Sequence, residues 1–186
     1  MVIIIVMLAA IIVLLLGKDK EESAGPPTNY NRVSDGSTGL SFNMSKKFAP
    51  IPRNELAAMN PGFTYGFRPA DDPDASCILS QSPLIASGTL PSSARLRAGL
   101  FQEVKKVHPD VRLDNPRTAS NPVRFGKAAG VLLELHYSEG ARKIKRVEVI
   151  AVGKSTQMIA YCQSLARDNQ RYYDDFTTFF SSLSLK

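Results

Sequence analysis

Histidine and cysteine are scarce in this chain, and tryptophan is absent. Two residues of each of the first two types occur in 186 residues. His108 and His136 lie far apart and neither belongs to a cysteine or histidine cluster, so the sequence indicates no metal site and no nucleophile–base pair. The glycine-rich phosphate-binding patterns and the Gly-x-Ser-x-Gly pattern are also missing. We therefore predict a protein that is not an enzyme and that binds no metal ion or cofactor.

Charged residues are missing altogether from the first sixteen positions, MVIIIVMLAAIIVLLL, which also carry no hydrogen-bonding side chain. A helix that crosses the hydrocarbon core needs roughly 20 apolar residues, with about 17 as the lower limit. No Lys or Arg precedes this run and no small-x-small cleavage site ends it, which favours an uncleaved anchor over a signal peptide. We predict a single N-terminal transmembrane helix at residues 1–17. A cleaved signal peptide and a buried core helix are the alternatives.

A polar segment separates this run from the rest of the chain. Residues 18–37 are rich in charge, Pro, Gly, Ser and Asn, and we interpret them as a flexible linker. Lys18 and Lys20 follow the apolar run, and the positive-inside rule taken literally places the domain in the cytoplasm. The acidic residues beside these two lysines reduce this bias.

Residues 38–186 have the length of one ordinary domain, about 150 residues. The chain carries a net charge of +6, which favours contact with anionic lipid headgroups or an acidic partner, or only gives a solvated basic face. The candidate partner-binding residues form one basic cluster: Arg142, Lys143, Lys145 and Arg146. Nucleic-acid binding would require interleaved exposed aromatic residues, and the aromatic residues here follow core patterns, so we predict no nucleic-acid partner.

The two cysteines, Cys77 and Cys162, lie in apolar segments far apart in the sequence. They could form one disulfide in an oxidising compartment. Buried free thiols are the more ordinary outcome for two such residues. The sequence leaves both states open.

The second half of the domain shows the clearest periodicity. Residues 131–137, 143–152 and 155–164 each alternate apolar and polar side chains. Short glycine-containing turns separate them, which predicts an antiparallel meander of three strands. Residues 169–182 then carry aromatic side chains at three- and four-residue spacing, which predicts a helix packed on the sheet. This stripe consists of Tyr172, Phe176, Phe179, Phe180 and Leu183.

The first half gives weaker signals. Short strands are predicted at residues 40–44, 63–68 and 76–80, with a further one at 123–125. A helix is predicted to start near Ser92 and to end before Pro109. Its apolar face is predicted to consist of Leu96, Leu100, Val104 and Val107. This order of elements predicts an α+β fold with a central antiparallel sheet and helices packed on it.

Two segments of the domain resemble the PsbP-like, or Mog-like, fold family. Gly39–Pro50, GLSFNMSKKFAP, is similar to the opening strand and loop of the family, with Phe48 where an aromatic residue, often Trp, is found. Val131–Leu185 is similar to its ending, which is a strand, a short turn like that at Ser138–Arg142, two more strands and an aromatic helix. The resemblance implies a PsbP-like α/β/α sandwich, here preceded by the predicted transmembrane helix.

The resemblance also carries an expectation about function. The family includes the extrinsic PsbP subunit of photosystem II, the Ran-binding Mog proteins and bacterial membrane-tethered domains, which mostly act as non-enzymatic binding or assembly factors. It therefore implies a non-catalytic accessory subunit or assembly factor of a larger membrane protein complex, with other membrane subunits as partners and an extracytoplasmic domain. The alternative is a tethered extracytoplasmic module that binds a lipid or small ligand between sheet and helix. No functional residue carries over, because no binding motif of any branch is recognisable.

Overall fold

The structure is a computed structural model that describes residues 28–84, 92–114 and 123–185. The predicted transmembrane helix at residues 1–17 and the first part of the predicted linker lie outside these residues. Within the described part of the chain, no helix has the length and apolar character needed to span a membrane.

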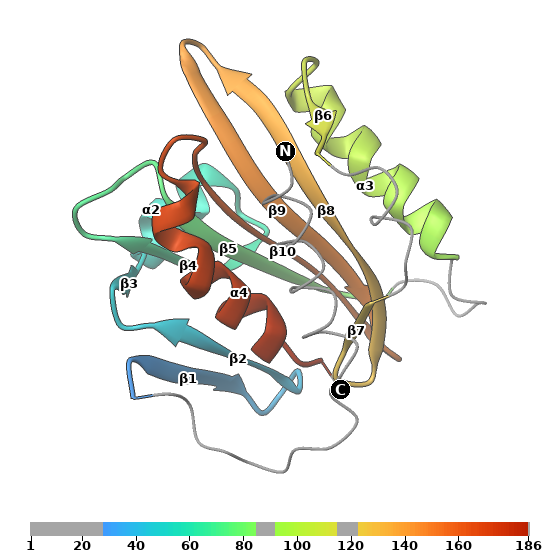
Figure 1. Ribbon diagram of the computed structural model, residues 1–186. Helices are drawn as coiled ribbons and strands as arrows, with labels where there is room; N and C mark the ends of the chain where they lie inside the picture. Colours follow the sequence, from blue (N-terminus) through green and yellow to red (C-terminus); the bar gives the residue numbers. More distant parts are fainter. Residues whose placement is uncertain (1–27, 85–91, 115–122, 186) are drawn as a thin grey trace.

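A large antiparallel sheet forms the centre of the domain (Figure 1). Its strand order is β3-β4-β5-β10-β9-β8-β6, with β7 paired to β8, and β1 and β2 form a separate two-stranded sheet. The strands are β1 Tyr30–Asp35, β2 Leu40–Ser45, β3 Phe48–Pro50, β4 Phe63–Pro69, β5 Ser76–Pro83, β6 Arg112–Leu113, β7 Val123–Phe125, β8 Ala128–Glu139, β9 Arg142–Val152 and β10 Thr156–Leu165. The helices are α2 Arg53–Met59, α3 Ser93–Val107, η2 Asn169–Tyr172 and α4 Tyr173–Ser182.

The predicted three-strand meander is confirmed as β8, β9 and β10. These strands pair antiparallel along their whole length, with Leu132 opposite Val149 and Ile159 opposite Ile150. The turn between β8 and β9 contains Gly140 at φ 61°, a left-handed conformation that glycine adopts without strain. The predicted alternation of apolar and polar residues therefore assigns successive side chains to the two opposite faces of the sheet.

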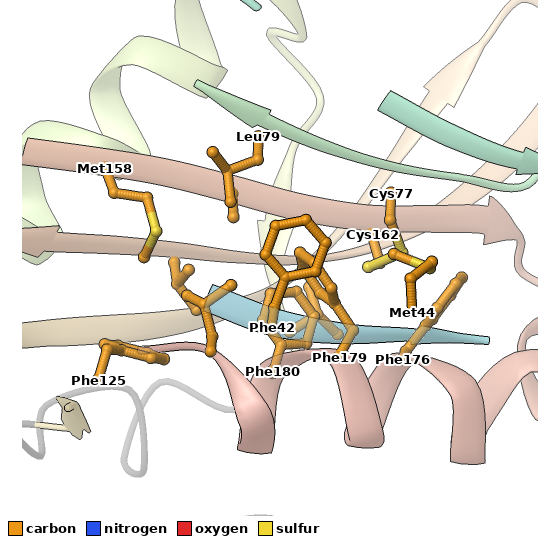
Figure 2. Packing of buried hydrophobic residues seen from close by; sticks show 14 of the residues in the cluster. Phe42, Met44, Cys77, Leu79, Phe125, Met158, Cys162, Phe176, Phe179 and Phe180 are labelled. Atoms are coloured by element: carbon orange, nitrogen blue, oxygen red, sulfur yellow. A yellow bond between two sulfur atoms is a disulfide. The ribbon is translucent and has the colours of Figure 1, made fainter. Parts of the chain in front are cut away.

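One face of the sheet packs against α4 and the β1–β2 hairpin. Figure 2 shows Phe176, Phe179 and Phe180 of α4 pointing toward the strands that carry Cys77 and Cys162. The predicted aromatic helix is thus confirmed, and all three of its phenylalanine side chains are buried. Phe42 of β2 completes this layer, with its ring centroid 5.2 Å from that of Phe179 in an edge-to-face arrangement.

The opposite face is covered by α2 and α3. Leu100 and Val104 of α3 pack against Leu133 and Leu135 of β8. Val107, predicted on the same face, is 73% exposed. At 3.6 residues per turn the buried stripe is centred between Val104 and the partly buried Phe101, so Val107 falls at its margin.

The predicted boundary between linker and domain is wrong. Residues 30–35, interpreted as part of a flexible linker, form β1 and pair in full register with β2, from Tyr30–Ser45 to Asp35–Leu40. The Tyr30 hydroxyl also donates a 3.3 Å hydrogen bond to Asp175 of α4. The strand escaped prediction because it lies outside the core: its side chains are exposed or half-buried, so no apolar alternation marks it.

The two cysteines form a disulfide, so the more ordinary outcome of free thiols is wrong. Cys77 of β5 stands directly opposite Cys162 of β10 in the strand register, with a Cα–Cα distance of 4.0 Å. Both side chains are buried in the core beneath α4. The pairing depends on a register between strands 85 residues apart, which no local sequence pattern contains.

Candidate functional site

A cavity of about 480 Å³ lies between α4 and the sheet, and we call it the helix–sheet cavity. Its volume falls in the range typical of small-molecule sites, about 300 to 1,000 Å³. The apolar part of its wall is formed by Leu132, Val147, Phe176 and Phe180. The charged part is formed by Asp114, Glu134, His136 and Lys145. The cavity is therefore amphipathic.

Strand alternation positions these groups. Leu132, Glu134 and His136 occupy alternate positions of β8 and share one face of the sheet. In the antiparallel register, Val147 of β9 lies opposite Glu134 and Lys145 lies opposite His136. Polarity thus increases along the strand pair toward the turn, while α4 covers the apolar end.

The charged groups form a network centred on Asp114, the residue that follows β6. Its Oδ2 lies 2.7 Å from Nε2 of His136 and 3.2 Å from Nζ of Lys145. Burial acts to raise the pKa of Asp114, but the hydrogen bond and the charge of His136, followed by the charge of Lys145, outweigh it, so the pKa lies below its usual value. Asp114 is therefore held as a carboxylate with both of its partners in place.

Glu134 is in a different situation. Its side chain is 9% exposed, and Oε2 lies 3.8 Å from Nζ of Lys145, which is longer than a hydrogen bond. Burial raises the pKa of Glu134 above its usual value, and the attraction of Lys145 offsets this only in part. The carboxyl group of Glu134 is thus buried at the cavity with a weaker partner than Asp114 has.

A second polar cluster lies on the opposite face of the sheet. The guanidinium carbon of Arg146 lies 4.0 Å from the centroid of the Tyr161 ring and 5.2 Å from that of Tyr137. Its nitrogens donate to Gln163 at 2.6 Å and pair with Glu148 at 3.4 Å. Burial raises the pKa of Tyr161 to about 12 and also raises that of Glu148, although Arg146 opposes both effects. The polar groups of this cluster therefore find their hydrogen-bond and ion-pair partners within it, and their contacts link β8, β9 and β10 on this face of the sheet.

The histidine that ends α3 belongs to this second cluster. The ring of His108 stacks on Tyr137 with centroids 3.8 Å apart, and burial, followed by the charge of Arg146, lowers its pKa. His136 lies on the other face, in the helix–sheet cavity. The two histidines therefore lie on opposite faces of the sheet.

The structure places the four residues of the predicted basic cluster in different surroundings. Lys145 lies in the helix–sheet cavity and Arg146 in the cluster on the opposite face. Arg142 and Lys143 lie at the start of β9 and are exposed. Arg142 pairs with Asp74 and, at 2.9 Å, with Glu139, whereas Lys143 donates to Ser138 at 2.7 Å. A single basic patch does not form.

Sequence reasoning named Lys145 but missed Asp114, Glu134 and His136 as members of the site. Glu134 and His136 are polar residues at alternate positions of β8, and the residues beside them in the strand are buried. Polar residues in such a buried strand are a usable signal of a polar site. Asp114 carried no such signal, because only the pairing of β6 with β8 brings it to His136. Across residues 28–84, 92–114 and 123–185, no group of three or more His, Cys, Asp or Glu side chains is arranged to hold a metal ion.

Similarity to known proteins is visible in structure rather than in sequence. No protein-family model and no curated protein sequence matches the chain. The solution structure of cyanobacterial PsbP (CyanoP) from Synechocystis sp. PCC 6803 aligns with a TM-score of 0.64 at 14% identity, over 90% of this chain and 99% of that one. The crystal structure of LpqN, involved in cell envelope biogenesis of Mycobacterium tuberculosis, aligns with a TM-score of 0.60 at 15% identity, over 84% and 90% of the two chains.

These similarities agree with the resemblance seen in the sequence. The two alignments extend over 90% and 84% of this chain, so the likeness concerns the fold as a whole. The protein has the PsbP-like α+β fold.

Proposed function

We propose that this protein is a non-catalytic accessory subunit or assembly factor of a larger membrane protein complex. The observation that carries the proposal is the PsbP-like fold, present in a chain that begins with sixteen consecutive apolar residues. LpqN, one protein of this fold, is involved in cell envelope biogenesis of Mycobacterium tuberculosis. The apolar run would hold the domain at the bilayer and so raise its effective concentration near other membrane proteins.

The disulfide supports an extracytoplasmic position for the domain. Disulfides form and persist in oxidising compartments and are rare in the reducing cytosol. The bond between Cys77 and Cys162 therefore favours the outer side of the membrane over the cytoplasmic side suggested by Lys18 and Lys20. The charge bias is small, since acidic residues stand among the lysines.

The surface proposed to contact a partner is the tip of the β8–β9 hairpin, which projects from the domain in Figure 1. Of the predicted basic residues, Arg142 and Lys143 are exposed there, whereas Lys145 and Arg146 are engaged inside the two clusters. The partner-binding role therefore falls to Arg142 and Lys143. Their charge suits an acidic surface of a membrane subunit.

Affinity purification of the full chain in mild detergent tests this proposal. We expect membrane proteins to co-purify in stoichiometric amounts and the variant Arg142→Gln/Lys143→Gln to lose much of this material. A matched control is Lys105→Gln/Lys106→Gln, which removes two exposed lysines of α3. A monodisperse protein without partners, or equal loss in both variants, would contradict the proposal.

A second candidate function is favoured by a specific observation. The helix–sheet cavity offers a partly open amphipathic space of about 480 Å³, as a module that binds a lipid or small ligand would require. The two functions are compatible, because the hairpin tip and the cavity use different residues. A ligand that co-purifies with a partner-free protein would favour this second function alone.

A further inference from the structure

The helix–sheet cavity has an apolar end and a charged end, and each restricts the ligand that it can hold. Leu132 and Val147 from the sheet and Phe176 and Phe180 from α4 form the apolar end. These side chains offer no hydrogen-bond partner to water, so an apolar group that fills this end gains the free energy of removing hydrocarbon surface from water. The ligand should therefore carry a hydrocarbon body.

At the charged end, Glu134 has a more distant cationic partner than Asp114 has. Two carboxylates, Asp114 and Glu134, share the single ammonium group of Lys145. Nζ of Lys145 is 0.6 Å closer to Asp114 than to Glu134, from distances of 3.2 and 3.8 Å. The carboxylate of Glu134 is therefore the less closely paired of the two.

The two carboxylates also discriminate against an anionic ligand. A carboxylate or phosphate head that approached Lys145 would meet Asp114 and Glu134 on either side of it, and like charges at such distances repel. Arg167 also lines the cavity, but it is 80% exposed and pairs with Asp168 at 3.3 Å. A cationic head, in contrast, would approach Glu134 more closely than Lys145 does at 3.8 Å and would donate a hydrogen bond to its carboxylate.

We propose that the helix–sheet cavity binds an amphipathic amine, with its ammonium group on Glu134 and its hydrocarbon body between Phe176, Phe180 and the sheet. This assignment deepens the second candidate function and is independent of the accessory role. Asp114 and Lys145 act as positioning groups. Because they pair with each other at 3.2 Å, the ammonium group of Lys145 stays 3.8 Å from Glu134 and does not fully neutralise that carboxylate. The site needs no covalent chemistry.

Calorimetric titration of the full chain in lipid nanodiscs tests the assignment, with empty nanodiscs titrated in parallel to subtract partitioning. The probes are octylamine, octanol and octanoate, which share one hydrocarbon chain and differ in their heads. We expect saturable binding of octylamine, weaker binding of octanol, and no saturable binding of octanoate. Binding of octanoate as tight as that of octylamine, or no saturable binding of any probe, would overturn the proposal.

Two variants separate the role of Glu134 from general effects. Glu134→Gln keeps the shape of the side chain and should weaken octylamine binding by about tenfold or more, as expected for a hydrogen bond between charged groups. Glu103→Gln removes an exposed carboxylate of α3 and should leave the affinity unchanged. Circular dichroism of each variant verifies the fold. Unchanged octylamine affinity in a folded Glu134→Gln protein would rule out the proposed contact, whatever the purification of partners shows.

Discussion

Cys77 on β5 and Cys162 on β10 face each other in the strand register and are joined by a disulfide in the core beneath α4. The bond links the strands contributed by the first half of the chain to the meander contributed by the second half. It therefore crosses the centre of the sheet instead of tying down a loop or a terminus.

The disulfide should contribute strongly to stability. It closes a loop of 85 residues, and restricting such a loop in the unfolded chain is worth about 2 to 5 kcal/mol. Replacing both cysteines by alanine should lower the free energy of unfolding by that amount, as measured by urea unfolding of the full chain in mild detergent. A change below about 0.5 kcal/mol, or free thiols in the oxidised wild-type protein, would contradict this.

Phe176 should be one of the most costly positions to truncate. It is 4% exposed, and its ring contacts those of Tyr172 and Phe48 at centroid distances of 5.8 and 6.2 Å. Phe176→Ala should destabilise the domain by about 3 to 5 kcal/mol, because it removes a buried ring and leaves a cavity. Met59→Ala, at a position that is 52% exposed, is the control and should have little effect. Similar melting temperatures for the two variants would mean that α4 does not pack on the core through Phe176.

Asp114 should make stability depend on acid pH. Its pKa is lower in the folded state than in the unfolded chain, so its ionised form stabilises the fold above the ordinary aspartate value of about 3.9. This contribution disappears as the pH falls through the lowered pKa. The difference in melting temperature between wild type and Asp114→Asn should therefore be larger at about pH 6 than at about pH 3. An equal difference at both pH values would show that His136 and Lys145 do not stabilise the carboxylate.

Glu134 should show the opposite pH dependence. Burial raises its pKa in the folded state, so the folded protein holds this proton more tightly than the unfolded chain does. Stability is then lost as the pH rises from the ordinary glutamate value, about 4.3, through the raised pKa. The advantage of wild type over Glu134→Gln should shrink over this interval, in thermal unfolding without any ligand. If the stability advantage of wild type grew over this interval instead, Glu134 would have a stronger cationic partner than Lys145 at 3.8 Å.

The apolar N-terminal run gives a prediction about fractionation. The full chain should remain in the membrane pellet after a carbonate wash, whereas a chain lacking residues 1–22 should be released and keep its circular dichroism spectrum. Retention is expected because residues 1–17 just reach the length needed to cross the hydrocarbon core, and a segment that crosses it stays in the bilayer at high pH. A mature protein whose sequence starts near Lys18 would favour the cleaved signal peptide instead.

Local patterns predicted most of the fold, and the failures have one common cause. The strands β8, β9 and β10 alternate clearly because each has a buried face, and α4 has an aromatic stripe for the same reason. β1 was missed because its side chains stay at the surface. The helix α2 was missed because it has seven residues and buries only Leu56, too little for a periodicity to be seen.

The candidate site could be predicted only in part. The sequence places Glu134 and His136 on one strand face, but their neighbours come from other segments through the strand register. Asp114 reaches His136 only through the short strand β6, and Phe176 reaches the same space only through the docking of α4. Lys145 was named for its charge as a partner-binding residue, whereas the structure places it beside two carboxylates.

The position of β10 has a consequence for how the protein is made. β10 is the last strand of the chain but lies between β5 and β9, so the strands β3, β4 and β5 keep one open edge until residues 156–165 have been synthesised. Exposed strand edges invite pairing with other chains, and contacts between distant residues form slowly. The nascent first half therefore needs protection from aggregation for the time in which the ribosome adds the second half. Oxidation of Cys77 by the correct partner can begin only when Cys162 has reached the same compartment.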